Sequence, residues 1–92
     1  MQFAKVLRER VRHGEITTSV RIWKSCRVKV GGRYKLGDGH VVVDRVSELS
    51  IEDITPTLAR QGGFGSVGEL LRVARHGTGS RVFLVEFHFE AA

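Results

Sequence analysis

The chain has 92 residues, the size of one small domain with a single core. Apolar residues make up 41% of it and charged residues 27%, and these ordinary proportions exclude a wholly disordered chain. No apolar run approaches the roughly 18 residues of a membrane span, and the first residues lack the apolar core of a signal peptide, so no membrane partner is expected. Cys26 is the only cysteine, so no intrachain disulfide is possible and a reducing cytoplasm is the expected compartment.

Positive charge is concentrated in the first third of the chain. Residues 1–35 contain ten Lys or Arg residues against two acidic ones, a balance of +8, whereas residues 36–92 contain five against eight, a balance of −3. A basic third on a small domain indicates an anionic partner, most often nucleic acid. An ordinary soluble surface with a high isoelectric point is the alternative interpretation.

A helix and a strand are predicted at the start of the chain. Phe3, Leu7 and Val11 recur every four residues between charged residues, and a glycine follows where helices commonly end. This pattern predicts an amphipathic helix over residues 2–13. Residues 17–23 are rich in β-branched side chains and predict a strand.

Short strands predominate in the rest of the chain. Apolar runs separated by glycine turns predict strands over residues 28–30, 33–36, 40–49 and 81–89. In the last of these strands, one face is entirely apolar and is the predicted core side: Phe83, Val85, Phe87 and Phe89.

Two helices are predicted before the last strand. Thr55 and Pro56 suit the N-cap and the first turn of a helix that ends at the next glycine pair. The capping-box pattern Ser66-x-x-Glu69 opens a second helix, which is expected to end near His76. This order of elements predicts a single α+β domain across all 92 residues, with a small, strongly curved sheet and flanking helices.

The strand predicted over residues 17–23 has one apolar and one polar face. Thr18, Val20 and Ile22 point one way, and the residues between them present two hydroxyls and the cation of Arg21 on the other face. Such a set of groups suits a phosphate, a carboxylate or a nucleoside. An ordinary solvated strand has the same pattern, so both interpretations remain open.

Several short motifs follow one another along nearly the whole chain: Phe3 to Val11 before a glycine, Gly14-x-x-Thr17-x-Ser19-x-Arg21, Gly32-x-Tyr34-x-Leu36, Ile51-Glu52-Asp53-Ile54, Gly63-Phe64-x-Ser66-x-x-Glu69-Leu70 and Val82-Phe83-Leu84-Val85-Glu86-Phe87. In their order and spacing, the chain resembles an ASCH domain of the PUA-like superfamily. The resemblance implies a small β-barrel with helices around it and a role in RNA metabolism.

The resemblance also implies two possible chemistries. Some ASCH proteins hydrolyse the amide of N4-acetylcytidine and another is a ribonuclease, with a strand motif of roughly Gly-x-Lys-Thr-x-Thr-x-Arg whose lysine is essential. Here Ile16 stands at the lysine position, Ser19 at the threonine position of the amidohydrolase, and Glu69 at its glutamate, while Arg21 is kept. Isoleucine cannot act as an acid, a base or an electrostatic stabiliser, so binding is favoured over catalysis. Whether the chain is an enzyme stays open, and in that case the catalytic candidates are Ser19, Glu69 and Lys24.

We therefore predict an RNA or nucleotide-like ligand, with no cofactor and no metal, because the four histidines are scattered. The predicted ligand-binding residues are Thr17, Ser19, Arg21, Trp23, Lys24 and Glu69. The predicted nucleic-acid contacts are Lys5, Arg8, Arg12, Arg21, Lys24 and Arg27.

Most of these residues also have an ordinary structural explanation. Glu69 completes a capping box with Ser66, and an ion pair between Glu69 and Arg21 would join strand to helix. Trp23 either stacks on a base or packs in the core. The cations of the first helix either follow a phosphate backbone or form its solvated face.

Overall fold

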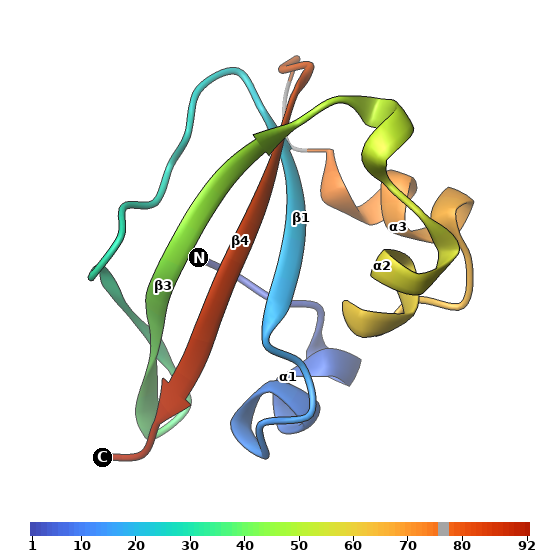
Figure 1. Cartoon of the computed structure of the whole chain (residues 1–92). Helices are drawn as coiled ribbons and strands as arrows, with labels where there is room; N and C mark the ends of the chain where they lie inside the picture. Colours follow the sequence, from blue (N-terminus) through green and yellow to red (C-terminus); the bar gives the residue numbers. More distant parts are fainter. Residues whose placement is uncertain (76–77) are drawn as a thin grey trace.

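The computed structural model describes residues 1–75 and 78–92 and shows an α+β domain built on one curled antiparallel sheet (Figure 1). The strands lie in the order β1-β4-β3-β2, so the last strand of the chain lies between the first and the third. In chain order the elements are α1 (Lys5–Arg12), β1 (Thr18–Trp23), β2 (Arg33–Leu36), β3 (Gly39–Leu49), the 3₁₀ turn η1 (Ile51–Asp53), α2 (Pro56–Gln61), α3 (Val67–Ala74) and β4 (Arg81–Glu90). The predicted fold class is confirmed, since the curved sheet forms half a barrel with helices beside it.

Two predicted elements differ from the structure by more than one residue, and the predicted end of a third lies outside the described residues. The first helix begins at Lys5 instead of residue 2, because Ala4 has an extended backbone with φ −56° and ψ 142°. The predicted strand at residues 28–30 is wrong, since these residues form coil and a turn, and only the glycine pair that follows bonds to β3. The last helix is described to Ala74, and its predicted end near His76 lies outside the described residues.

Apolar side chains cover both faces of the sheet. On the inner face, α1 and the first residues of the chain pack on one core cluster, which includes Leu7, Val11, Trp23, Val43, Phe83, Val85 and Phe87. On the outer face, α2 and α3 pack on a second cluster, which includes Val20, Ile22, Ala59, Leu70, Ala74 and Val82. Side chains alternate along β1 as predicted, but both of its faces are covered, so its polar side chains do not lie on a solvated face.

β4 is a central strand and supplies much of the inner core. Phe83, Val85 and Phe87 are buried, and Phe89 is half-buried against the same cluster. This confirms the predicted core side of the last strand. The Phe87 ring also contacts the Phe3 ring, with 5.4 Å between the centroids, so the start of the chain packs on its last strand.

The two helices on the outer face begin at the predicted caps. The Leu58 amide donates to Thr55 Oγ1 at 3.1 Å, and the Glu69 amide donates to Ser66 Oγ at 3.1 Å. The Glu69 carboxylate accepts from the Gly65 amide at 3.3 Å, one residue before the cap. These bonds satisfy amides that have no partner within a helix, so the sequence signals for both helix starts are correct.

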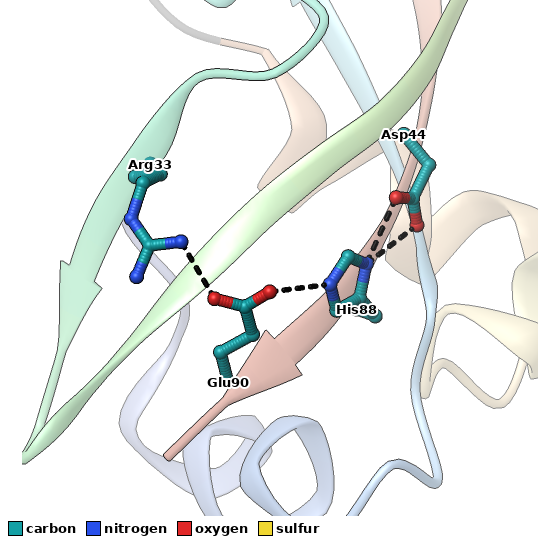
Figure 2. A network of polar contacts seen from close by, with 4 residues as sticks. All are labelled: Arg33, Asp44, His88 and Glu90. Carbon is teal, nitrogen blue, oxygen red and sulfur yellow. Dashed lines mark hydrogen bonds and ion pairs between the residues drawn. The ribbon is translucent and has the colours of Figure 1, made fainter. Parts of the chain in front are cut away.

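A chain of charged groups occupies the part of the outer face that α2 and α3 leave uncovered (Figure 2). The Glu90 carboxylate accepts from Arg33 Nη1 at 2.6 Å, and its other oxygen lies 3.2 Å from His88 Nε2. His88 Nδ1 lies 2.8 Å from Asp44, which stands in β3 where the pairing with β4 shifts at a bulge. The hydrogen bond to Asp44, followed by that to Glu90, raises the pKa of His88.

Replacing His88 with Gln should change how stability depends on pH. The folded-state pKa of His88 is raised above its ordinary value, so its stabilising contribution is fully present below about pH 6.5 and is lost as the pH rises through the folded-state pKa. Relative to His88→Gln, the wild type should therefore lose Tm as the pH rises from about 6.5 through the folded-state pKa of His88. Thermal unfolding of both proteins measures this difference, and parallel profiles of Tm against pH would contradict it.

Candidate ligand-binding site

The free edge of β1 lines a cleft of about 260 Å³, here called the edge cleft. Its polar lining consists of Gln2, Thr18, Ser19 and Arg21. Its apolar walls come from the first residues of the chain, from α1 and from the region of α2 and α3: Phe3, Leu7, Phe64 and Val73. The described lining of the edge cleft therefore includes four polar residues within largely apolar surroundings.

Main-chain groups of β1 also face the edge cleft. The Phe87 amide donates to the Thr17 carbonyl at 2.9 Å, and in an antiparallel ladder such bonds recur at every second residue. The amides and carbonyls of Thr18 and Val20 therefore point away from β4, towards the free edge. At the far end of the strand, a parallel bridge at Ile22 occupies this edge. The Thr18 hydroxyl is buried, and no hydrogen-bond partner for it lies among the residues that the structure describes.

Arg21 is a buried cation where β1 meets the start of the chain, and it is only 7% exposed. Its Nε donates to Ser19 Oγ at 2.8 Å, and its Nη2 donates to the Gln2 carbonyl at 2.5 Å. Its guanidinium carbon lies 5.1 Å from the centroid of the Phe3 ring. Burial lowers the pKa of Arg21 to about 10, so the group remains charged at neutral pH. Because water solvates this charge poorly, it interacts with an anion more strongly than an exposed arginine does.

Two further clefts adjoin the first residues of the chain and carry several of the predicted nucleic-acid contacts. The first, called the helix cleft, has a volume of about 400 Å³ and is lined by the cations Arg8, Arg12 and Lys35. The second, called the loop cleft, has a volume of about 280 Å³ and is lined by Arg21, Trp23, Arg27 and Val28. Arg21 thus lines both the edge cleft and the loop cleft.

Ion pairs offset part of the positive charge of the helix cleft. Arg12 lies 2.8 Å from the Glu9 carboxylate and 3.0 Å from that of Asp38. Arg8 Nε donates to a backbone carbonyl at the start of the chain at 3.2 Å, and Lys5 is exposed on α1. Within the helix cleft, the charge available to an anion therefore comes more from Arg8 and the exposed Lys35 than from Arg12, and Lys5 lies outside this cleft.

The structure brings two of the predicted ligand-binding residues together. Ser19 and Arg21 both line the edge cleft and bond to each other. Thr17 is exposed just before β1, and the neighbouring Thr18 lines the cleft in its place. The site thus contains Ser19 and Arg21 as predicted, and Thr18 lines it in place of the predicted Thr17.

The other predicted ligand-binding residues lie outside the edge cleft. Lys24 is exposed in the coil after β1. Glu69 is exposed near the start of α3, and across the described ranges no ion pair joins it to Arg21. Trp23 is only 3% exposed and its ring lies 5.9 Å from that of Phe83, so it is a core residue rather than an open stacking surface.

Sequence patterns do not identify part of the lining of the site. They contain Phe64 only within a family motif, and they single out neither the apolar Val73 nor the polar Gln2. Helical periodicity places Phe3 in the core, where it indeed packs, but it does not reveal the contact with Arg21. No local signal identifies these residues, because they reach β1 only through the folding of α2, α3 and the start of the chain.

Ile16, at the position of the ASCH lysine, is a core residue with 1% exposure. Gly63 packs against it so closely that a Cβ there would lie 2.8 Å from Ile16 Cδ1 and 2.8 Å from Leu7 Cδ2. Gly63 also has φ +93°, a conformation that favours glycine. The position of Ile16 is therefore closely packed and suits an apolar side chain.

Among its described lining residues, the edge cleft offers groups for binding but no acid–base pair. These residues include no carboxylate, imidazole, thiol or amine, and Arg21 is their single ionisable group. A serine or threonine hydroxyl without an adjacent base is a weak nucleophile. What the described lining supplies is a cation and hydroxyls that can bind a ligand.

The chain matches no protein-family model, no curated protein and no solved structure. Within the described residues, no helix is long and apolar enough to cross a membrane. The same residues contain no group of three or more His, Cys, Asp or Glu side chains placed to hold a metal ion. Function is therefore inferred from the edge cleft and the charges beside it.

Replacing Ile16 with Lys should strongly destabilise the fold. The substitution places an ammonium group in a closely packed apolar position, and we expect a loss of about 3 kcal/mol or more in the free energy of unfolding. Ile16→Met, the matched control, keeps the site apolar and should cost less than about 1.5 kcal/mol. Urea unfolding compares the two, and equal stabilities would show that this position tolerates the lysine of the family motif.

Proposed function

We propose that the protein binds RNA or a nucleotide-like ligand and uses the edge cleft as its specific site. The observation that carries this proposal is the buried guanidinium of Arg21, which lies with the Ser19 hydroxyl in a cleft with aromatic and aliphatic walls. A poorly solvated cation suits a phosphate or carboxylate oxygen. Hydroxyls and a free strand edge suit the edge of a base, and apolar walls suit its faces.

Cations outside the edge cleft would hold the backbone of a longer ligand. Arg8 and Lys35 line the helix cleft, and Arg27 lines the loop cleft beside Arg21. Such contacts are electrostatic and independent of sequence, so they supply affinity while the edge cleft supplies selectivity. This division agrees with the excess of positive charge in the first third of the chain.

The ASCH resemblance supports the same function. It implies a PUA-like domain that acts in RNA metabolism, and the half-barrel with flanking helices is compatible with the small barrel of that family. The single cysteine favours a reducing cytoplasm as the compartment of this proposed role.

Hydrolysis of an N4-acylated cytidine or of RNA is the alternative that the resemblance implies. Ser19 would supply a hydroxyl and Glu69 a carboxylate, with Lys24 as the nearest amine in the sequence. Glu69 and Lys24 are not among the lining residues of the edge cleft, and Ile16 is apolar, so this alternative has less support.

We expect salt-dependent binding to a single-stranded oligouridylate of about eight nucleotides, with a log–log salt slope of about −0.7 per phosphate contact. Arg21→Met should weaken this binding about tenfold or more, because a charge-assisted hydrogen bond of about 1.5–3 kcal/mol is lost. Fluorescence anisotropy of a labelled oligonucleotide measures both effects.

Arg45→Met is the matched control for this experiment. It removes the same charge from a side chain that is 74% exposed and lies outside the three clefts, so any loss of affinity should be small. Equal losses for the two variants would show that Arg21 contributes only general charge. An absence of binding at low salt would exclude nucleic acid and favour a protein-interaction domain.

We expect no measurable turnover of N4-acetylcytidine by the wild-type protein. A hydroxyl without a neighbouring base lacks proton transfer, which typically contributes about 10²–10⁴ in rate. Chromatographic detection of released cytidine tests this expectation. Turnover that is abolished by Glu69→Gln but retained by Glu52→Gln, an exposed glutamate of η1, would instead establish the hydrolase.

A further inference from the structure

The first residues of the chain separate the three clefts from one another. Gln2 lines the edge, helix and loop clefts, and Met1 lines the last two. Phe3 lines the edge and helix clefts, and Arg21 lines the edge and loop clefts. Residues 1–3 therefore form the partition between neighbouring basic clefts.

Main-chain carbonyls of this segment bond to guanidinium groups that an anionic ligand would use. The Gln2 carbonyl accepts from Arg21 Nη2 at 2.5 Å, and the Phe3 carbonyl accepts from Arg8 Nε at 3.2 Å. An oxygen in this position takes the place of a phosphate or carboxylate oxygen on the same donor. The segment and a ligand therefore compete for the same donors.

The anchoring of the segment is uneven. Phe3 is only 7% exposed, with its ring 5.4 Å from that of Phe87 and 5.1 Å from the Arg21 guanidinium carbon. Gln2, in contrast, is exposed, and its carbonyl holds it to Arg21. The exposed Gln2 thus lies over the buried cation, between Phe3, which is buried, and Met1, which is half-buried against the inner core cluster.

We propose that residues 1 and 2 form a strap, anchored at Phe3, that covers Arg21 until an anionic ligand displaces it. Displacement joins the edge and loop clefts at Arg21 and opens them to the helix cleft, so that one groove carries Arg8, Arg21 and Arg27. Such a groove suits a single strand of several nucleotides better than a mononucleotide, which the edge cleft alone accommodates. This inference rests on the proposed RNA binding for its ligand, but not for the movement of the strap.

If the strap must open before the ligand binds, the apparent affinity equals the intrinsic affinity multiplied by the fraction of molecules in which the strap is open. Loosening it should therefore strengthen binding, whereas damage to a segment that is part of the site should weaken binding. A competing strap and a segment that belongs to the site therefore predict opposite changes in affinity when the segment is loosened. Gln2→Gly loosens the strap without removing a buried side chain, and should tighten binding of the oligouridylate about two- to fivefold.

Trp23 reports movement of the strap without any ligand. It is the only tryptophan, is 3% exposed, and lines the loop cleft together with Met1 and Gln2. Opening should expose its ring to iodide, so quenching of its fluorescence should increase in Gln2→Gly and more strongly in Phe3→Ala. Val82→Ala, the control, makes a smaller cavity in the outer core cluster, away from residues 1–3, and should leave the quenching at the wild-type level.

The experiment combines iodide quenching with anisotropy titrations of the oligouridylate on the wild type and the three variants. Greater quenching and tighter binding in Gln2→Gly, with neither change in Val82→Ala, support the strap. Unchanged quenching in both Gln2→Gly and Phe3→Ala overturns it. Greater quenching with equal or weaker binding also overturns it, because the segment then does not compete with the ligand. If the wild type binds no oligonucleotide, the proposed function fails, and the quenching still decides whether the strap moves.

Discussion

Burial of both faces of β1 is the constraint on which the other features depend. α1 and the first residues of the chain cover the inner face, and α2 and α3 cover much of the outer face. A polar side chain on β1 can then find a hydrogen-bond partner only in another protein group or at the strand edge. Arg21 bonds to the Ser19 hydroxyl and to a main-chain carbonyl, so these polar groups collect in the edge cleft. The Thr18 hydroxyl also lies at this cleft, but it is buried and has no hydrogen-bond partner among the described residues.

Local patterns predicted most of the fold correctly because each element depends on its own residues. The caps at Thr55 and Ser66 and the apolar face of the last strand needed no information from elsewhere in the chain. The errors arose where distant contacts decide the structure. Phe3 continues the helical spacing of α1, yet it packs on the last strand from an extended segment. Residues 28–30 contain two valines, but only the glycines after them reach β3.

The candidate site was predictable in part, for a related reason. Alternation along β1 was sufficient to place Ser19 and Arg21 together. The exchange of Thr17 for Thr18 depends on where the strand edge becomes free, which the sequence of β1 does not specify. Glu69 and Lys24 were nominated from a resemblance and from proximity in the sequence, and neither lines the cleft. The apolar walls belong to segments that meet β1 only in the folded chain.

The position of β4 has a consequence for how the chain acquires its structure. β4 is the last element to be synthesised, yet it is the strand to which both β1 and β3 bond. Until β4 is available, β1 has no strand partner and only the β2–β3 hairpin can form by local pairing. Assembly of the sheet therefore requires contacts between residues more than sixty positions apart, such as Thr18 with Glu86, and contacts of such separation slow folding. During synthesis, β1, which lines the edge cleft, is the part of the sheet that waits longest for its neighbouring strand, and its exposed edge is then open to pairing with other chains.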